Sequence, residues 1–385
     1  MVTAAQPFTA HEAGTLRDTK TPRASRNRTI AAVRHLGPNW YASVMGTAIV
    51  ATAGAGLPGH LPGLRTACAV VWALSLTLLV ALLAARALHW RHHSDQARAH
   101  LLDPAVAPFY GCLSMALLAV GGGTLLVGRD WIGTPAAVAV DAVLFTAGTV
   151  VGLAAAVTVP YLMVVRHRIE PGQASPVWLL PIVAPMVSAA LGPLLVPHLS
   201  SGQPRETLLL ACVAMFGLSL LGTFVMLPVI FARLVTSGPL PLALTPTLFL
   251  VLGPLGQSTT AVGKFADAAP GVVPAPFDQG FALLAVLYGV PVLGFALLWL
   301  ALAVAMVVRA RRQGMGFAMT WWAFTFPVGT CVTGAEGLAR HTGLAAFDAL
   351  AVALYVLLLA AWSVAAVRTA HGLVSGKLLA APSRK

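Results

Sequence analysis

The chain has 385 residues, of which 58% are hydrophobic and only 9% are charged, and its formal net charge is +12. Soluble domains carry about 25% charged residues, so this composition excludes an ordinary water-soluble protein. Apolar runs long enough to cross a hydrocarbon core of ~30 Å as helices recur along the whole chain. The period-2 alternation of a membrane β-barrel is absent from the sequence. The sequence therefore predicts an all-α integral membrane protein.

Residues 1–37 are polar and basic and are expected to form a disordered cytoplasmic tail rather than a signal peptide. Ten helices are predicted after this tail, separated by connections rich in Pro and Gly. Their approximate ranges are 39–57, 64–88, 106–127, 135–165, 176–197, 205–234, 244–263, 279–308, 317–338 and 344–368. We therefore expect one ten-helix domain over 38–370 and a second cytoplasmic tail over 371–385.

The positions of the 24 Lys and Arg residues predict the topology. Nineteen lie in the tails and in or beside the even-numbered connections. The odd-numbered connections hold one each: Arg65, Arg129, Arg205, Lys264 and Arg340. Cytoplasmic loops of membrane proteins carry the excess of basic residues. We therefore expect a protein of the plasma membrane with both termini in the cytoplasm. The positive charge thus reports topology and does not indicate nucleic acid as a partner.

A repeat of about seventy residues runs through the chain. An aromatic residue opens each repeat, at Trp40, Phe109, Trp178, Phe249 and Trp322, with steps of 69, 69, 71 and 73 residues. Each repeat contains an odd-numbered helix rich in Gly, Pro, Ser and Thr, followed by an even-numbered helix rich in Leu, Val and Ala. Since lipid rejects polar groups, the odd helices are expected to ring an axis inside the even ones. Close helix packing through small residues is the alternative reading.

The contents of the odd helices suggest a pore. Pro181, Pro185, Pro254 and Pro327 are expected to bend these helices. Uncharged dipoles that hold anions weakly are predicted to line the pore, although each hydroxyl could instead bond to its own helix. The predicted lining is Ser43, Gly46, Thr47, Ser114, Ser188, Gln257, Ser258, Thr259, Thr325, Thr330 and Thr333.

Two charged residues of the odd helices have candidate roles. Lys264 is expected to add a positive field near one mouth of the pore. Glu336 is expected either to carry a coupled proton or to pair with Arg340, four residues further along the helix. We favour the pairing.

Motifs for catalysis or metal binding are absent from the sequence. There is no G-x-S-x-G, H-E-x-x-H or P-loop. Four cysteines without C-x-x-C spacing, Cys68, Cys112, Cys212 and Cys331, are interpreted as small buried hydrophobes. The histidine-rich stretch 89–100 is interpreted as a solvated basic loop. We expect no enzyme activity, no cofactor and no metal, and an integral-membrane enzyme or scaffold is the least favoured class.

Three motifs resemble the tellurite-resistance/dicarboxylate transporter (TDT) family over about 38–370: NWYASVMGTAIVATAG, GPLGQSTTAVGKF and WWAFTFPVGT. That family includes tellurite-resistance proteins, malate permeases, sulfite efflux pumps and slow-type anion channels. The resemblance implies five hairpins with quasi-five-fold symmetry around a central pore, and a homotrimer with one pore per protomer. It also implies a gate formed by a phenylalanine of the ninth helix. By motif this is Phe326, beside Pro327, with Phe324 as the competing position.

The expected function is transport of a small anion across a lipid membrane. Candidate substrates are a C4-dicarboxylate such as malate, or an oxyanion such as sulfite or tellurite. The alternative is a proton-coupled C4-dicarboxylate carrier in which Glu336 or the substrate carries the proton.

Overall fold

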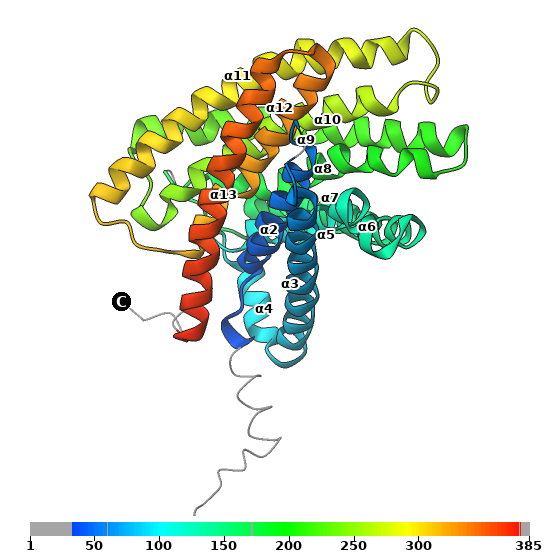
Figure 1. Cartoon of the computed structure of the whole chain (residues 1–385). Helices are drawn as coiled ribbons and strands as arrows, with labels where there is room; N and C mark the ends of the chain where they lie inside the picture. The colour runs from blue at the N-terminus through cyan, green and yellow to red at the C-terminus, as the bar shows by residue number, and fades with distance from the viewer. Residues whose placement is uncertain (1–32, 60, 171, 377, 379–385) are drawn as a thin grey trace, which may run out of the picture.

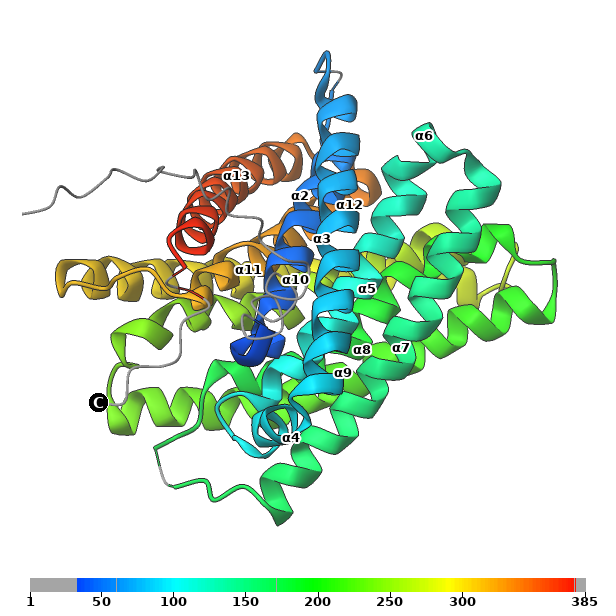
Figure 2. The same cartoon turned by 90° about the horizontal axis from the view of Figure 1, so that it is seen from below.

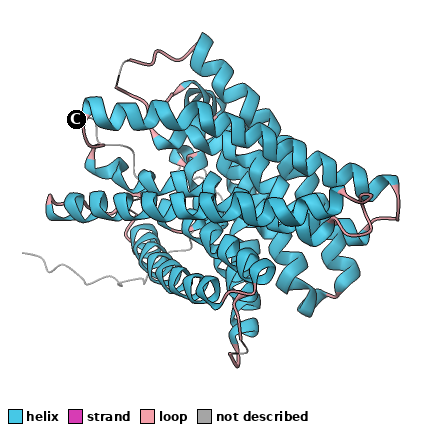
Figure 3. Ribbon diagram, turned by 90° about the horizontal axis from the view of Figure 1, so that it is seen from above, coloured by secondary structure: helices cyan, strands magenta, loops and turns pink. Residues whose placement is uncertain are grey.

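The apolar segments fold into helices along nearly the whole chain (Figures 1 and 3). The computed structural model describes residues 33–59, 61–170, 172–376 and 378, and within them it contains helices and loops but no strand. A helix satisfies its backbone hydrogen bonds internally, which an apolar environment requires. The predicted all-α class is confirmed for these residues. The predicted N-terminal tail lies almost entirely outside the described residues, as does the end of the C-terminal one.

Short and long helices alternate along the chain. The short ones are α2 (Tyr41–Gly56), α5 (Gly111–Gly123), α8 (Leu179–Leu191), α10 (Leu252–Ala268) and α12 (Phe326–Thr342). The long ones are α3 (Leu64–His92), α7 (Thr134–Val165), α9 (Gln203–Ser237), α11 (Phe277–Arg312) and α13 (Ala345–Val374). Two further helices, α4 (Ser94–Leu102) and α6 (Arg129–Ile132), lie in connections. Each of the ten predicted ranges coincides with one short or one long helix.

Burial separates the two sets of helices. Only 22–28% of the most apolar stretch of each long helix is buried, against 83–89% for the segments Ala107–Ile132 and Pro176–Leu194, which contain α5 and α8. Nearly every residue of α2, α10 and α12 is also buried. The long helices expose mainly large apolar side chains, for example Val157 and Leu287. The short helices are therefore inner and the long ones outer (Figure 2).

The inner helices contact one another in a closed ring. Helix α2 contacts α5, α5 contacts α8, α8 contacts α10, α10 contacts α12, and α12 contacts α2 again. Each inner helix also contacts the outer helix that follows it in the chain, as α2 contacts α3 and α12 contacts α13. Residues far apart in sequence are thereby brought around one centre.

The sequence repeat corresponds to a structural feature at the start of each inner helix. A 3-10 segment precedes each one: η2 (Pro38–Trp40), η3 (Ala107–Tyr110), η5 (Pro176–Trp178), η8 (Leu242–Val251) and η9 (Met319–Phe324). The five aromatic residues that open the repeats lie in these segments. Three of the segments begin with Pro at the first or second position, where its missing N–H is not needed.

Three of the four prolines that were expected to bend the inner helices lie at the starts of those helices. Pro181, Pro254 and Pro327 lie in the first turns of α8, α10 and α12, where the N–H groups have no partner within the helix and a proline fits without bending it. Pro185 lies inside α8. The outer helices contain three internal prolines, which are Pro160, Pro228 and Pro291. Internal prolines are thus not concentrated in the inner helices.

Seven helical segments of the described chain are long and apolar enough to cross a membrane. They comprise the five outer helices and the segments that contain α5 and α8. Helices α2, α10 and α12 have 16, 17 and 17 residues, which corresponds to only about 25 Å at the helical rise. The preceding 3-10 segments lengthen all three, because that helix rises about 2 Å per residue.

The histidine-rich stretch is helical rather than a loop, although most of its side chains, including Arg91, His92 and Arg98, are exposed. Helix α3 continues through it to His92, and α4 follows. The side chain of His89 is fully buried, and its ring stacks on that of His100 with 5.5 Å between the ring centroids. Burial, followed by the nearby charge of Arg86, lowers the pKa of His100 in α4, so this ring packs in its neutral form. The solvated interpretation therefore holds for the charged side chains and fails for the ring of His89, whose burial the basic character of the segment did not indicate.

Candidate functional site

A cavity of about 260 Å³ lies among the inner helices. All five inner helices contribute to its wall, including Thr52 of α2, Ala119 of α5, Ala190 of α8, Gln257 of α10 and Phe326 of α12. We call this cavity the vestibule. Its position follows from the ring, because five parallel segments that meet at one centre leave space where their side chains are small.

Four basic side chains line the vestibule: Arg65, Arg129, Lys264 and Arg340. They are four of the five basic residues that the sequence places in the odd-numbered connections, each near the end of a different inner helix or just after it. The fifth, Arg205, instead donates hydrogen bonds to the backbone oxygens of Leu199 and Pro197, at 2.9 and 3.1 Å. Cations also interact favourably with the C-terminal end of a helix dipole, but four of them around one cavity create a positive field inside it.

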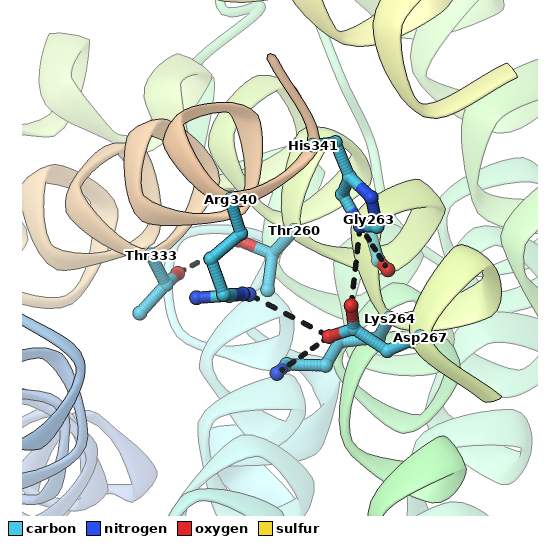
Figure 4. Close-up of polar contacts among 7 residues, drawn as sticks. All are labelled: Thr260, Gly263, Lys264, Asp267, Thr333, Arg340 and His341. Atoms are coloured by element: carbon cyan, nitrogen blue, oxygen red, sulfur yellow. Dashed lines mark hydrogen bonds and ion pairs between the residues drawn. The ribbon is translucent and has the colours of Figure 1, made fainter. Parts of the chain in front are cut away.

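The four cations differ in how they are neutralised. Arg65 binds Asp130 through two nitrogens, at 2.5 and 2.9 Å. Lys264 and Arg340 both approach Asp267, with nitrogen–oxygen distances of 3.2 and 3.6 Å (Figure 4). Arg129 forms no ion pair within the described residues. The vestibule therefore holds one unpaired cation and two loosely paired ones.

Glu336 is the one carboxylate that lines the vestibule wall among its described residues. Its side chain is buried, and Oε1 has no hydrogen-bond partner in the described chain. A Cβ added to Gly56 would collide with this carboxylate, so glycine makes room for it. The predicted pairing with Arg340 is wrong, because Arg340 lies against Asp267 instead.

Phe326 separates the vestibule from a second, much smaller cavity. This second cavity has a volume of about 10 Å³ and is lined by Phe326 itself and by apolar side chains such as Met45, Met115 and Val183. A cavity needs about 10–15 Å³ to hold one water molecule, so the second cavity has no room for an anion. Pro327 follows Phe326 in the first turn of α12 and fixes where that helix begins.

The competing aromatic residue, Phe324, packs elsewhere. Its ring meets that of Phe249 edge-on, with 4.8 Å between centroids, and that of Trp321 at 5.7 Å. It lines neither the vestibule nor the second cavity. The structure therefore places Phe326, and not Phe324, at the centre of the ring.

The family of the chain follows from comparison with known sequences. The profile of the voltage-dependent anion channel family matches residues 35–370. The chain belongs to this family. The resemblance stated from the sequence is thereby confirmed, and the chain is a multi-pass membrane protein of an anion-transporting class.

Several relatives of this anion channel family member match over most of their length. An uncharacterized transporter of Methanocaldococcus jannaschii is 26% identical over 349 residues, which cover 90% of this chain and 96% of the relative. A sulfite efflux pump of Arthroderma otae is 27% identical, covering 88% of this chain and 91% of the pump. A sulfite efflux pump of Trichophyton rubrum is also 27% identical, with 86% and 89% covered. These relatives are named as transporters, and none of the names describes an enzyme.

In this anion channel family member, most of the predicted pore-lining hydroxyls bond to backbone oxygens. The donors to a backbone oxygen three or four residues earlier in the chain are Ser43, Thr47, Ser258, Thr259, Thr325 and Thr330. Ser114 donates to Gly148 O of α7 at 2.6 Å, and Ser188 accepts a hydrogen bond from Thr149 at 2.9 Å. Neither cavity includes any of these side chains, and their part in a pore stays a prediction.

Other polar residues line the vestibule. Gln257 and Thr333 were predicted to line the pore and do line the vestibule, and the buried Oε1 of Gln257 has no hydrogen-bond partner in the described chain. Sequence reasoning left out Thr52 and Thr260. The hydroxyl oxygens of Thr260 in α10 and Thr333 in α12 lie 2.7 Å apart (Figure 4). The threonine-rich stretch after Gln257 was the signal, but the sequence alone did not show which of its hydroxyls face the cavity.

Small residues of the inner helices are points of close helix contact. A Cβ on Gly46 would overlap the side chain of Thr325. A Cβ on Gly256 would lie 2.6 Å from the backbone nitrogen of Cys331 in α12. The alternative reading of the small residues, that they allow close packing, therefore holds at these two positions.

We expect Gly256→Ala to destabilise the protein by about 1–3 kcal/mol, because the rigid backbone of α12 cannot move away from the added methyl group. Gly253→Ala is the matched control in the same helix, since its Cβ would meet nothing closer than 3.9 Å. That control should be neutral or slightly stabilising, because alanine favours a helix by up to about 1 kcal/mol over glycine. Thermal unfolding of both variants in detergent measures the difference. Equal melting temperatures would contradict the close contact.

Proposed function

We propose that this protein transports small oxyanions, sulfite foremost, through a central pore between its five inner helices, and that Phe326 closes this pore. The observation that carries the proposal is the position of Phe326 at the base of a vestibule that four basic side chains line. An apolar ring at a narrow point stops ions by excluding water, while positive and dipolar groups above it attract anions. The relatives named as sulfite efflux pumps support sulfite as the first substrate to test.

The proposal includes ten membrane crossings arranged as five hairpins. Support comes from the contact ring of α2, α5, α8, α10 and α12 and from the exposed apolar surfaces of the outer helices. The proposed topology has both termini in the cytoplasm and the vestibule open to the outside of the plasma membrane, and the excess of basic residues in the tails and even connections supports it.

Reconstitution into vesicles tests this function. Sulfite, malate, chloride and tellurite are compared at a membrane potential set by a potassium gradient and valinomycin. We expect saturable sulfite flux that follows the potential and exceeds the flux into protein-free vesicles. Absence of any anion flux from correctly folded protein, including a variant without the Phe326 ring, would falsify the proposal.

A proton-coupled carrier is the second candidate, and one observation favours it. Glu336 is buried in the vestibule wall with Oε1 unpartnered in the described chain, which is an environment in which a carboxyl group readily exchanges a proton. An uncoupler distinguishes the two mechanisms. Uptake by a carrier should stop when the proton gradient is removed, whereas flux through a channel should persist under a clamped potential.

A further inference from the structure

One carboxylate at the rim of the vestibule is shared by three nitrogen donors (Figure 4). Asp267 Oδ2 lies 3.2 Å from Lys264 Nζ and 3.6 Å from Arg340 Nη2, and Oδ1 lies 3.1 Å from His341 Nε2. Lys264 belongs to α10 and Arg340 to α12, and both line the vestibule. Asp267 and Lys264 also line an adjoining cavity of about 400 Å³. The carboxylate thus lies where an anion entering the vestibule would meet its first cations.

We propose that Asp267 is a resident competitor for the transported anion, occupying the donors that an entering oxyanion uses and thereby setting the affinity of the vestibule. This inference rests on the proposed anion transport. A carboxylate and a small oxyanion present the same chemistry, namely two or more negatively charged oxygens that accept charge-assisted hydrogen bonds from Lys and Arg. Either one can therefore satisfy Lys264 and Arg340.

The distances show which cations are free to exchange partners. The Arg65–Asp130 pair is bidentate, with hydrogen bonds of 2.5 and 2.9 Å, which is the geometry of a persistent pair. The contacts of Asp267 with Lys264 and Arg340 are longer and single. Both of these cations are also partly exposed to the vestibule. An incoming anion can displace Asp267 from Lys264 and Arg340, whereas Arg65 stays bound to Asp130.

A purely structural role explains less of this arrangement. Helices α10 and α12 are joined by the hydrogen bond between the hydroxyls of Thr260 and Thr333, by the contact of Thr260 Oγ1 with the backbone oxygen of Thr330, and by the close approach of Gly256 to Cys331. Partly exposed ion pairs add little to stability. The two helices therefore do not need Asp267 to hold them together.

Competition between Asp267 and the anion affects how fast the anion leaves the vestibule. An anion must be bound tightly enough to enter and weakly enough to leave. Asp267 offsets part of the positive charge of Lys264 and Arg340 and returns to them when the anion leaves. Release then does not leave two unpaired cations behind, so it is faster than it would be without the carboxylate.

Asp267→Asn tests this inference in vesicles that take up sulfite, measured in the full chain and again with Phe326→Ala so that opening does not limit the flux. We expect the half-saturating sulfite concentration to fall about 3- to 10-fold, which is the size that removal of one charge at about 4 Å produces in a water-like dielectric. The maximal flux should stay equal or decrease. The difference from the parent protein should shrink at high ionic strength, because salt screens exposed charges.

Asp278→Asn is the matched control. It removes the same charge from the first turn of α11, outside the vestibule, and should leave half-saturation unchanged. In a Lys264→Gln/Arg340→Gln background, Asp267→Asn should have no further effect, because the donors it frees are gone. A purely structural residue would not show this dependence.

Three results would overturn the inference: an unchanged half-saturation in Asp267→Asn, an equal shift in Asp278→Asn, or a shift that persists without Lys264 and Arg340. If Asp267→Asn does not fold, a second comparison decides. Lys264→Gln should then weaken sulfite binding less than Arg129→Gln. The charge of Lys264 is paired with Asp267, whereas Arg129 forms no ion pair in the described chain. Failure of the proposed function gives a different result, since neither the parent protein nor any of these variants would then conduct sulfite.

Discussion

Replacing Phe326 with alanine should raise anion flux by at least about tenfold, which corresponds to a barrier lowered by only about 1.4 kcal/mol. The ring is 2% exposed and lines both the vestibule and the small cavity beyond it. Removing it joins the two spaces and lets water enter, so the apolar barrier to ions disappears. Phe326→Leu should give an intermediate flux. Anion uptake into vesicles under a set potential measures all three proteins.

Phe324→Ala is the matched control for this prediction. It removes an aromatic ring two residues away that packs on Phe249 and Trp321 and lines neither cavity. Both variants lose packing and should be less stable, by about 3–5 kcal/mol where the ring is fully buried, so elution as a single folded species must be verified for each. An increase in flux that is equal in the two variants would show that loosened packing, and not an opened gate, conducts the anion.

Much of the fold could be predicted because membrane helices follow simple rules. The ranges of all ten segments, the alternation of inner and outer helices and the repeat marked by Trp40 or Phe249 depend on apolar length and on the rejection of polar groups by lipid. The proline bends could not be predicted, because the same proline breaks a helix in its middle and fits in its first turn. Where α10 and α12 begin depends on tertiary packing around Pro254 and Pro327.

The candidate site was predicted only in part. The motif that places Phe326 and the inner location of Gln257 and Glu336 agree with the cavity that these residues line. The direction of each hydroxyl was not predictable, since a threonine in a helix can face a cavity or bond to its own backbone. Thr259 does the second, and its neighbour Thr260 lines the vestibule.

Apart from Lys264, which was predicted to add a positive field, the cations of the vestibule were interpreted from the sequence only as signals of topology. Arg65, Arg129 and Arg340 appeared as single basic residues in separate outer connections. Each of these residues lies at or just after the end of an inner helix, and together with Lys264 they line one cavity. The repeat therefore implied that these cations would converge. Their pairing with Asp130 and Asp267 depends on side-chain geometry and required the structure.

Reversing one vestibule charge should reduce anion flux strongly. Arg129 is the cation of this cavity that has no carboxylate partner among the described residues. In Arg129→Glu a negative charge replaces the positive one. Each unit charge at about 4 Å changes the energy of an anion by about 1 kcal/mol in water and about 4 kcal/mol near a protein surface. We expect sulfite flux at sub-saturating concentration to fall by at least about tenfold, and less at high ionic strength.

Arg205→Glu is the control for this reversal. It changes the same charge in the equivalent connection of another repeat, but Arg205 bonds to the backbone oxygens of Leu199 and Pro197 and does not line the vestibule. Its flux should remain within about twofold of the parent protein, because Arg205 does not line the vestibule and salt screens its charge from the anion. If both reversals reduce flux equally, the effect is that of a general surface charge. If neither does, anions do not pass the four cations, and the path must enter elsewhere in the ring.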